Sequence, residues 1–404
     1  MDDPHFERMA RGYRFAWPDV VLQVSRIREE KGQHRARVTV LEGGADGAAI
    51  DTHTFTIDSS VSRSSFAKSL HDKQNSIPWR DYIDAACIRT LLEEERGEPF
   101  VLVTGAPRDL TTSYLVRPLL VRNALNMVFG DGESGKSIVA QALAYLLHHG
   151  GRQLGFDFEP CNVLYLDYET EQENFEKRIA GLAEGFGLGE VANIHYRRCL
   201  QPLADDIEDI RQMVLDFRIE LVIVDSYGMA VGGDAIGLTE QRALFAALRS
   251  LGVTVLGVHH EPVIVQRERG AKPTPYGGRY WFNEHRWIWW VKASDPDDSG
   301  SRTISLHHTK ANVGPRWRRP IGLILTWKDD VPTLTRDDNR IADSPELTEK
   351  MNLKDRIAVQ LRRGKLSVKT IAENLDAKPD SVEKSLKRNR TLFVRTGDEW
   401  GLLG

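Results

Sequence analysis

The stretch Gly130-Asp131-Gly132-Glu133-Ser134-Gly135-Lys136-Ser137 has the spacing G-x-x-x-x-G-K-S of a phosphate-binding loop, or P-loop. Glycines let backbone N–H groups turn towards phosphates, and the lysine ammonium reaches the β- and γ-phosphates. The serine hydroxyl is a ligand for Mg²⁺. The segment predicts a site for ATP and Mg²⁺ that extends from Gly130 through Ile138.

The residues around this loop have the pattern that the motif requires. The apolar run Leu125–Phe129 enters it like a buried strand. Apolar residues at helical spacing follow it from Ile138 to Leu147. Strand, loop and helix therefore follow one another as in a nucleotide-binding α/β domain.

Composition limits the class of protein. The 404 residues, 41% hydrophobic and 28% charged, are typical of a soluble globular chain of two or three domains. With a net charge of −4, any nucleic-acid binding must come from local basic patches. The cysteines Cys87, Cys161 and Cys199 lie far apart, which fits a reducing cytoplasm and excludes a four-thiolate zinc site. No apolar run approaches the ~18 residues of a membrane span, so no membrane partner is expected.

The chain divides into three predicted domains and a linker. Residues 1–115 have two strand-like segments and two helical patterns, typical of an α+β accessory domain. Residues 116–337 alternate strands and helices, which predicts an α/β domain with a mostly parallel sheet and helices on both faces. Its later strands lack intervening helices and are expected to extend the sheet in antiparallel fashion. Residues 338–350 are a polar linker before the last domain, 351–404.

The last domain has the pattern of a winged helix-turn-helix: three short helices closed by a hairpin. Basic residues gather on its third helix and in its wing. We expect DNA contacts from Lys384, Lys387, Arg388, Arg390 and Arg395, although winged modules also dock proteins.

Hydrolysis of ATP needs more than a P-loop. Asp225 ends the most apolar strand, where ligands collect in a parallel sheet, and is expected to hold Mg²⁺ together with Ser137. No glutamate follows Asp225, so the group that activates water must come from elsewhere. Glu169, just after the strand at 163–167, is the favoured candidate, and Asp167 and Glu171 compete with it.

A histidine pair ends the next strand. His259 is expected to contact the γ-phosphate and to report its loss to the following loop. The alternative is that His259 and His260 are simply a surface pair at a strand end.

The order P-loop, strand with Glu169, strand ending in Asp225-Ser226 and strand ending in His259-His260 resembles RecA-like ATPases. Within them, it is most similar to the RepA-type replicative helicases of plasmids and phages. The resemblance covers about residues 116–330. It implies a ring, usually a hexamer, or a filament in which ATP lies between subunits, with Lys136 on the phosphates.

In related rings, a neighbouring subunit supplies a cation through a Lys-x-Arg motif at a strand end. Lys310-Ala311-Asn312 resembles it, but Asn312 stands where the arginine is expected. Lys310 is therefore a candidate for this cation, and Arg286 and Arg279 are alternatives.

Two further segments bear on DNA binding. The loop after His260 contains Arg267, Arg269 and Lys272, which suit a phosphate-contacting loop, and the resemblance places a DNA loop there. The tryptophans at 281, 287, 289 and 290 have two interpretations, a stacking platform for bases or a core strand, and the pattern favours the core.

Together these features predict an ATP-hydrolysing DNA motor, a RepA-type hexameric helicase of a plasmid, phage or mobile element. The alternative is an ATP-switched DNA-binding or recombination-mediator protein that does not unwind DNA.

Overall fold

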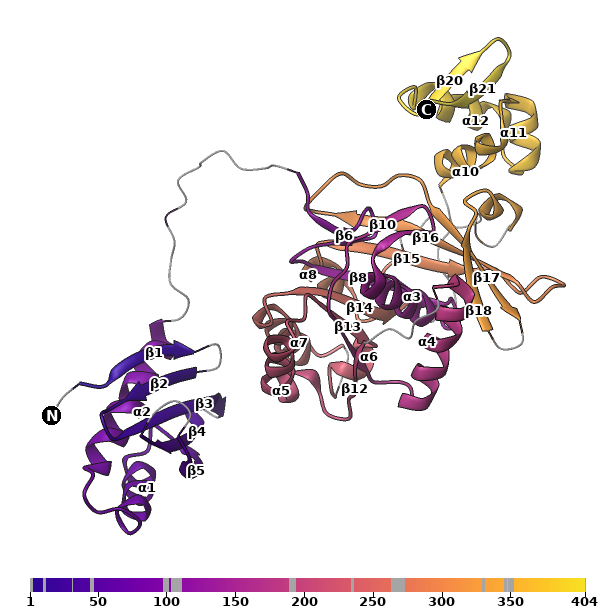
Figure 1. Ribbon diagram of the computed structural model, residues 1–404. Helices are drawn as coiled ribbons and strands as arrows, with labels where there is room; N and C mark the ends of the chain where they lie inside the picture. The colour runs from indigo at the N-terminus through magenta and orange to yellow at the C-terminus, as the bar shows by residue number, and fades with distance from the viewer. Residues whose placement is uncertain are drawn as a thin grey trace. The chain divides into compact units, whose positions relative to one another are not determined.

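The computed structural model describes residues 3–9, 12–30, 32–43, 47–96, 102, 111–188, 194–233, 236–262, 273–328, 331–344, 347 and 352–403. The chain divides into two compact units, Met1–Asp109 and Leu110–Gly404 (Figure 1). Each unit has its own core and is described by itself. None of the helices among the described residues combines the length and the apolar character that crossing a bilayer needs.

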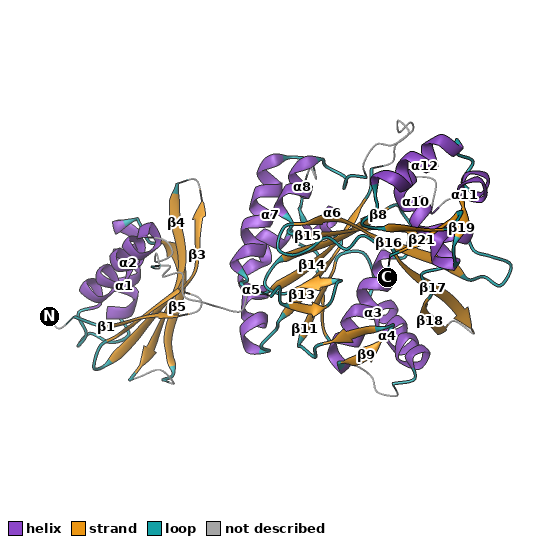
Figure 2. Cartoon of the chain, turned by 90° about the horizontal axis from the view of Figure 1, so that it is seen from above, coloured by secondary structure: helices purple, strands orange, loops and turns teal. Residues whose placement is uncertain are grey.

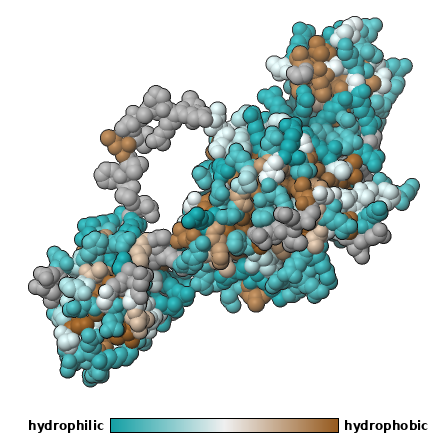
Figure 3. Space-filling model, viewed as in Figure 1, coloured by the Kyte–Doolittle hydropathy of each residue, from teal (hydrophilic) through white to brown (hydrophobic). Residues whose placement is uncertain are grey.

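The first unit is a five-stranded antiparallel meander packed against two helices. Its elements are β1 (His5–Met9), β2 (Gly12–Ala16), β3 (Val20–Glu30), β4 (Gln33–Glu42), β5 (Ala49–Thr56), α1 (Ser60–His71) and α2 (Trp79–Arg96). Only β3, β4 and the helices have a clear apolar pattern. The edge strands β1 and β5 are largely exposed, which explains why the sequence did not reveal them. Hydrophilic residues dominate the face of this unit seen in Figure 3.

The second unit is built on a nine-stranded sheet in the order β12-β11-β13-β14-β8-β15-β16-β17-β18. The strands from β12 to β15 are parallel, and β16, β17 and β18 extend the sheet in antiparallel fashion, so both parts of the sheet prediction are confirmed. The strands are β8 (Leu125–Gly130), β11 (Val163–Asp167), β12 (His195–Arg198), β13 (Leu221–Asp225), β14 (Thr254–His260), β15 (Trp287–Ala293), β16 (Arg302–Ala311), β17 (Ile321–Lys328) and β18 (Val331–Arg336).

Helices cover both faces of this sheet (Figure 2). Successive residues of β13 alternate between two cores: Leu221 and Ile223 pack with α3 and α4, whereas Val222 and Val224 pack with the helices of the other face. The helices are α3 (Lys136–His149) and α4 (Gln172–Phe186) on one face, and α5 (Leu203–Asp216), α6 (Tyr227–Ala230), α7 (Leu238–Ser250) and α8 (Arg279–Glu284) on the other. A small sheet of β7 (Leu120–Val121), β6 (Tyr114–Val116), β10 (Phe156–Phe158) and β9 (Gly151–Gln153) lies beside α3.

The tryptophans of β15 belong to the core. Trp287, Trp289 and Trp290 are at most 3% exposed, and each indole N–H donates a hydrogen bond inside the protein. Trp281 of α8 is fully buried. The predicted core strand is therefore confirmed, and these rings cannot form a stacking platform for bases.

The C-terminal region contains the predicted helices and hairpin. The elements are α10 (Leu353–Gln360), η2 (Leu361–Arg363), β19 (Leu366–Ser367), α11 (Val368–Asn374), α12 (Pro379–Arg388), β20 (Phe393–Thr396) and β21 (Glu399–Leu402), and the strands form a sheet in the order β19-β21-β20. Ser367 caps α11 by accepting a hydrogen bond from the Thr370 N–H. Within residues expected to be linker, η1 (Arg340–Asp343) forms, and Ile341 is buried against Leu347 and Val359.

Candidate functional site

The P-loop connects the C-terminal end of β8 to the start of α3. At Gly130, a Cβ would lie 2.2 Å from the Val291 carbonyl oxygen of the neighbouring strand. Gly135 has a φ of +81°, which favours glycine, and a Cβ there would meet Ile304 at 2.6 Å. The two glycines of the motif are thus required by the close approach of the backbone to β15 and β16.

The first turn of α3 has the features of an anion site. Its N-cap, Gly135, has no side chain, so no side-chain cap occupies the N–H groups at the helix start. The Lys136 side chain is buried, and its Nζ donates to the Asp131 carbonyl oxygen at 2.5 Å. Burial lowers the pKa of Lys136, and the negative charges of Asp225 and Glu169 oppose that shift. A phosphate would therefore meet a buried ammonium and the N–H groups of the first helical turn.

Asp225 lies at the C-terminal end of β13 and is 3% exposed. Its Oδ2 accepts a hydrogen bond from the Tyr165 hydroxyl at 2.7 Å, whereas its Oδ1 is buried with no partner among the described residues. Burial raises the pKa of Asp225 to about 6, although the hydrogen bond from Tyr165 favours the ionised form. An unpartnered carboxylate oxygen beside a serine hydroxyl fits the hard oxygen ligands that Mg²⁺ takes. Ser137 and Asp225 would hold that ion.

Glu169 lies two residues beyond β11 and faces Asp225 across the same cavity. Its Oε1 accepts a hydrogen bond from the Ser226 hydroxyl and lies 3.2 Å from His260 Nε2. The hydrogen bond with His260 lowers the pKa of Glu169 against the opposing effect of burial. The carboxylate is thus ionised at neutral pH and is held by two neighbours.

The two competing carboxylates have other partners. Asp167 is buried, and its Oδ1 accepts hydrogen bonds from the backbone N–H groups of Glu169 and Thr170, both at 2.9 Å. Glu171 forms an ion pair with Arg198. Asp167 therefore shapes the turn that carries Glu169, and neither competitor lines the cavity.

Alternation along β14 separates the two histidines. His259 is fully buried, its Nε2 donates to the Tyr276 carbonyl oxygen at 2.9 Å, and its ring lies 4.3 Å from the Trp281 ring. Burial lowers the pKa of His259 to about 4, so the ring is neutral. His260 instead lines the cavity beside Glu169. The structure thus places the neighbouring histidine, not the expected His259, at the nucleotide cavity.

The cavity has a volume of about 460 Å³. Lys136, Ser137, Glu169, Asp225 and His260 line it, and so do Arg178, Arg302, Leu325 and Trp327, which sequence reasoning missed. The strand order explains the layout: β11, β13 and β14 lie on one side of the P-loop strand β8, and β15, β16 and β17 lie on the other. The carboxylates therefore flank one side of the loop, and Arg302, Leu325 and Trp327 flank the opposite side.

Comparison with known families agrees with this geometry. Residues 99–263 match the family model AAA_25, described as an AAA domain. The chain carries an AAA-type P-loop ATPase domain. The match includes the P-loop, Glu169, Asp225 and both histidines of β14, and an AAA domain implies nucleotide binding. No curated protein matches the chain.

The residues expected to supply a cation to the nucleotide of a neighbouring subunit do not line the cavity of the AAA domain. Lys310 of β16 is opposite Ile288 of β15, towards the strand ends that lie away from the P-loop. Its Nζ donates to the carbonyl oxygens of Phe282 at 2.7 Å and Asn283 at 3.0 Å, and burial lowers its pKa. Arg279 and Arg286 are exposed. None of the three lines the nucleotide cavity.

The expected DNA-binding residues fall into two groups. Arg267, Arg269 and Lys272 lie outside the described residues. The basic residues of the C-terminal region are exposed, although Lys387 pairs with Glu383 at 2.6 Å and Arg395 with Asp398 at 3.5 Å. The group at exposed positions on and after α12 consists of Lys384, Lys387, Arg388 and Arg390.

Proposed function

We propose that the chain is a Mg²⁺-dependent ATPase that moves along or unwinds DNA, as a ring-forming helicase of the RepA type. The observation that carries the proposal is the meeting of Lys136, Asp225 and Glu169 around one cavity. When bound, ATP with Mg²⁺ supplies the phosphoanhydride bond and neutralises developing charge. Lys136 and the N–H groups of α3 bind the phosphates, and Ser137 and Asp225 hold the metal ion.

Glu169 orients the attacking water and takes its proton. His260 contacts Glu169 directly, so a change at the γ-phosphate side of the cavity alters the end of β14. The segment that follows contains Arg267, Arg269 and Lys272. This gives a short route from nucleotide state to the proposed DNA contacts, with His260 as the sensor.

The proposed ring rests on the position of Lys310. Because Lys310 lies near the strand ends opposite the P-loop, it serves a γ-phosphate only on a neighbouring chain, and Arg286, whose N–H bonds the Leu125 carbonyl oxygen, would do the same. We further propose that the C-terminal region is a winged helix and that α12 and Arg395 contact duplex DNA.

The test of this function combines ATP turnover with strand separation. We expect single-stranded DNA to raise the turnover number of the full chain, and a forked duplex to separate only with hydrolysable ATP. Turnover and DNA retention without strand separation would instead support the ATP-switched binding protein. Turnover that ignores DNA altogether would contradict both.

Trp327 is proposed as the surface that stacks on the adenine ring. It is 46% exposed, lies at the end of β17, and lines the cavity on the side of the P-loop away from the carboxylates. Because base–aromatic stacking contributes about 1–3 kcal/mol, we expect Trp327→Ala to weaken ATP binding about 5- to 150-fold. The turnover number should change little, because this contact is the same in the ground and transition states.

The matched control for Trp327 is Phe217→Ala, another exposed aromatic residue of the second unit, which does not line the cavity. Fluorescence titration with ATP measures both variants. Unchanged ATP affinity in Trp327→Ala would place the base elsewhere.

A further inference from the structure

The loop between β16 and β17 contains the run Arg316-Trp317-Arg318-Arg319. All four residues are exposed, with Trp317 at 36%. Arg318 forms no hydrogen bond or ion pair with any other described residue. In a chain with a net charge of −4, three arginines around an accessible indole are a strong local departure from the average.

The loop is held on the core by His308 of β16. The backbone N–H of Trp317 donates to His308 Nδ1 at 2.9 Å, and Arg316 Nε donates to the His308 carbonyl oxygen at 2.8 Å. The His308 ring lies 4.1 Å from the Trp287 ring and 4.6 Å from the Trp289 ring. Because burial lowers the pKa of His308 to about 4, the ring stays neutral and Nδ1 remains an acceptor. The loop is thus ordered in advance, which reduces the entropy lost on binding.

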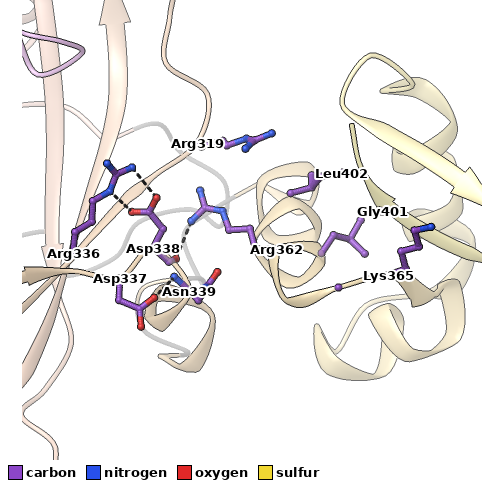
Figure 4. A pocket seen from close by; sticks show the side chains of 11 residues that line it. Arg319, Arg336, Asp337, Asp338, Asn339, Arg362, Lys365, Gly401 and Leu402 are labelled. Atoms are coloured by element: carbon purple, nitrogen blue, oxygen red, sulfur yellow. Dashed lines mark hydrogen bonds and ion pairs between the residues drawn. The ribbon is translucent and has the colours of Figure 1, made fainter. Parts of the chain in front are cut away.

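Two cavities meet at this loop, and cations dominate both. One, of about 640 Å³, is lined by Arg319, Arg336, Arg362 and Lys365 with Asp337 and Asp338 (Figure 4). The other, of about 320 Å³, is lined by Arg316, Arg318 and Lys354 with Asp355. Both therefore attract a chain of negative charges.

The acidic residues of the larger cavity already have partners. The Asp338 carboxylate binds Arg336 Nη2 at 3.0 Å and the Gly322 N–H at 2.9 Å. Asp337 accepts a hydrogen bond from the Asn339 N–H at 2.9 Å. Arg336 therefore offsets the charge of Asp338.

Arg362 connects the C-terminal region to the end of this loop. It donates to the Asp338 carbonyl oxygen at 2.8 Å and to the Pro320 carbonyl oxygen at 3.0 Å. Since Arg362 belongs to η2 and Pro320 ends the loop, the bond ties the C-terminal region to the arginine run. Lys365, three residues after Arg362, is exposed and lines the same cavity.

We propose that this surface binds single-stranded nucleic acid: Arg318, Arg319 and Lys365 contact successive phosphates, and Trp317 stacks on an unpaired base. Stacking on an accessible aromatic face needs a base that is free of its own stack, which favours a single strand over a duplex. The proposal rests on the nucleic-acid partner of the proposed function and adds a site distinct from α12 and from the loop after β14.

The test is fluorescence anisotropy of the full chain with a labelled oligothymidine, without nucleotide. We expect Trp317→Ala to weaken binding about 5- to 150-fold and Trp317→Phe to restore most of it. Arg318→Ala should weaken binding and reduce the slope of log affinity against log salt by about 0.7, because one phosphate contact is lost. Arg152→Ala, a 72%-exposed arginine on β9, is the control and should bind as wild type.

Several outcomes would overturn the proposal. Wild-type affinity and salt slope in both Trp317→Ala and Arg318→Ala would show that nucleic acid binds elsewhere. A duplex that binds as tightly as the single strand would exclude base stacking.

The same experiment separates this proposal from the proposed function. If the wild type hydrolyses ATP and Trp317→Ala binds the oligothymidine as tightly as the wild type, only this site is overturned. If Trp317→Ala weakens binding but the wild type does not hydrolyse ATP, the proposed ATP-driven motor is overturned and the nucleic-acid site stands.

Discussion

Lys136→Ala should abolish ATP hydrolysis, with a loss in turnover of at least about 100-fold. The Lys136 ammonium is buried at the start of α3 and already donates to the Asp131 carbonyl oxygen. Removing one pre-positioned donor from a developing anion typically costs about 100- to 1000-fold in kcat. Lys136 also contributes to ground-state binding, so ATP affinity should fall as well.

Thermal unfolding with and without Mg-ATP measures the binding part of this effect. At an ATP concentration 100 times its Kd, the wild type should gain about 2.7 kcal/mol of stability, whereas Lys136→Ala should gain little. Lys177→Ala is the control, because Lys177 is an exposed lysine of α4, paired with Glu173, outside the cavity. Full hydrolysis by Lys136→Ala would refute the nucleotide site itself.

Glu169→Gln should bind Mg-ATP normally and hydrolyse it about 100- to 10,000-fold more slowly, the usual range for loss of a general base. The substitution keeps the shape of the side chain, and the amide oxygen can still accept the hydrogen bond from Ser226. The amide cannot take a proton from water. Single-turnover hydrolysis and equilibrium ATP binding, measured on the same protein, separate chemistry from binding.

Glu171→Gln is the matched control for Glu169. Glu171 lies two residues further along the chain, pairs with Arg198 and is 59% exposed in its side chain. We expect its turnover to equal that of the wild type. Normal hydrolysis in Glu169→Gln, or a loss of ATP binding in place of turnover, would show that Glu169 does not activate the water.

Features that depend on neighbours along the chain were predictable. The P-loop, the strands β11, β13 and β14 and the helices between them have local signals, namely glycine spacing, apolar runs and helical periodicity. A polar residue at the end of a parallel strand lies at the ligand edge in any such sheet, so Asp225 and Glu169 could be named without coordinates. The buried tryptophans of β15 were also recognisable, because β-branched and aromatic residues suit a core strand.

The assignment between the two histidines of β14 was beyond local reasoning. Successive side chains of a strand point to opposite faces of the sheet, so only one of the two histidines can line the nucleotide cavity. Which one it is depends on the face that points to the P-loop. The sequence favoured His259, but the cavity contains His260, because Trp281 and Tyr276 occupy the space around His259.

The sequence by itself determined that this protein has a P-loop in an α/β domain, because those signals lie within a few residues of one another. Only the tertiary structure decided what surrounds the loop. Trp327 reaches the cavity through the antiparallel pairing of β16 with β17, and Lys365 lines one cavity with Arg319, where Arg362 bonds the end of the loop. Both placements depend on pairing between distant segments, which minimises the free energy of the whole chain and has no signature in any one stretch.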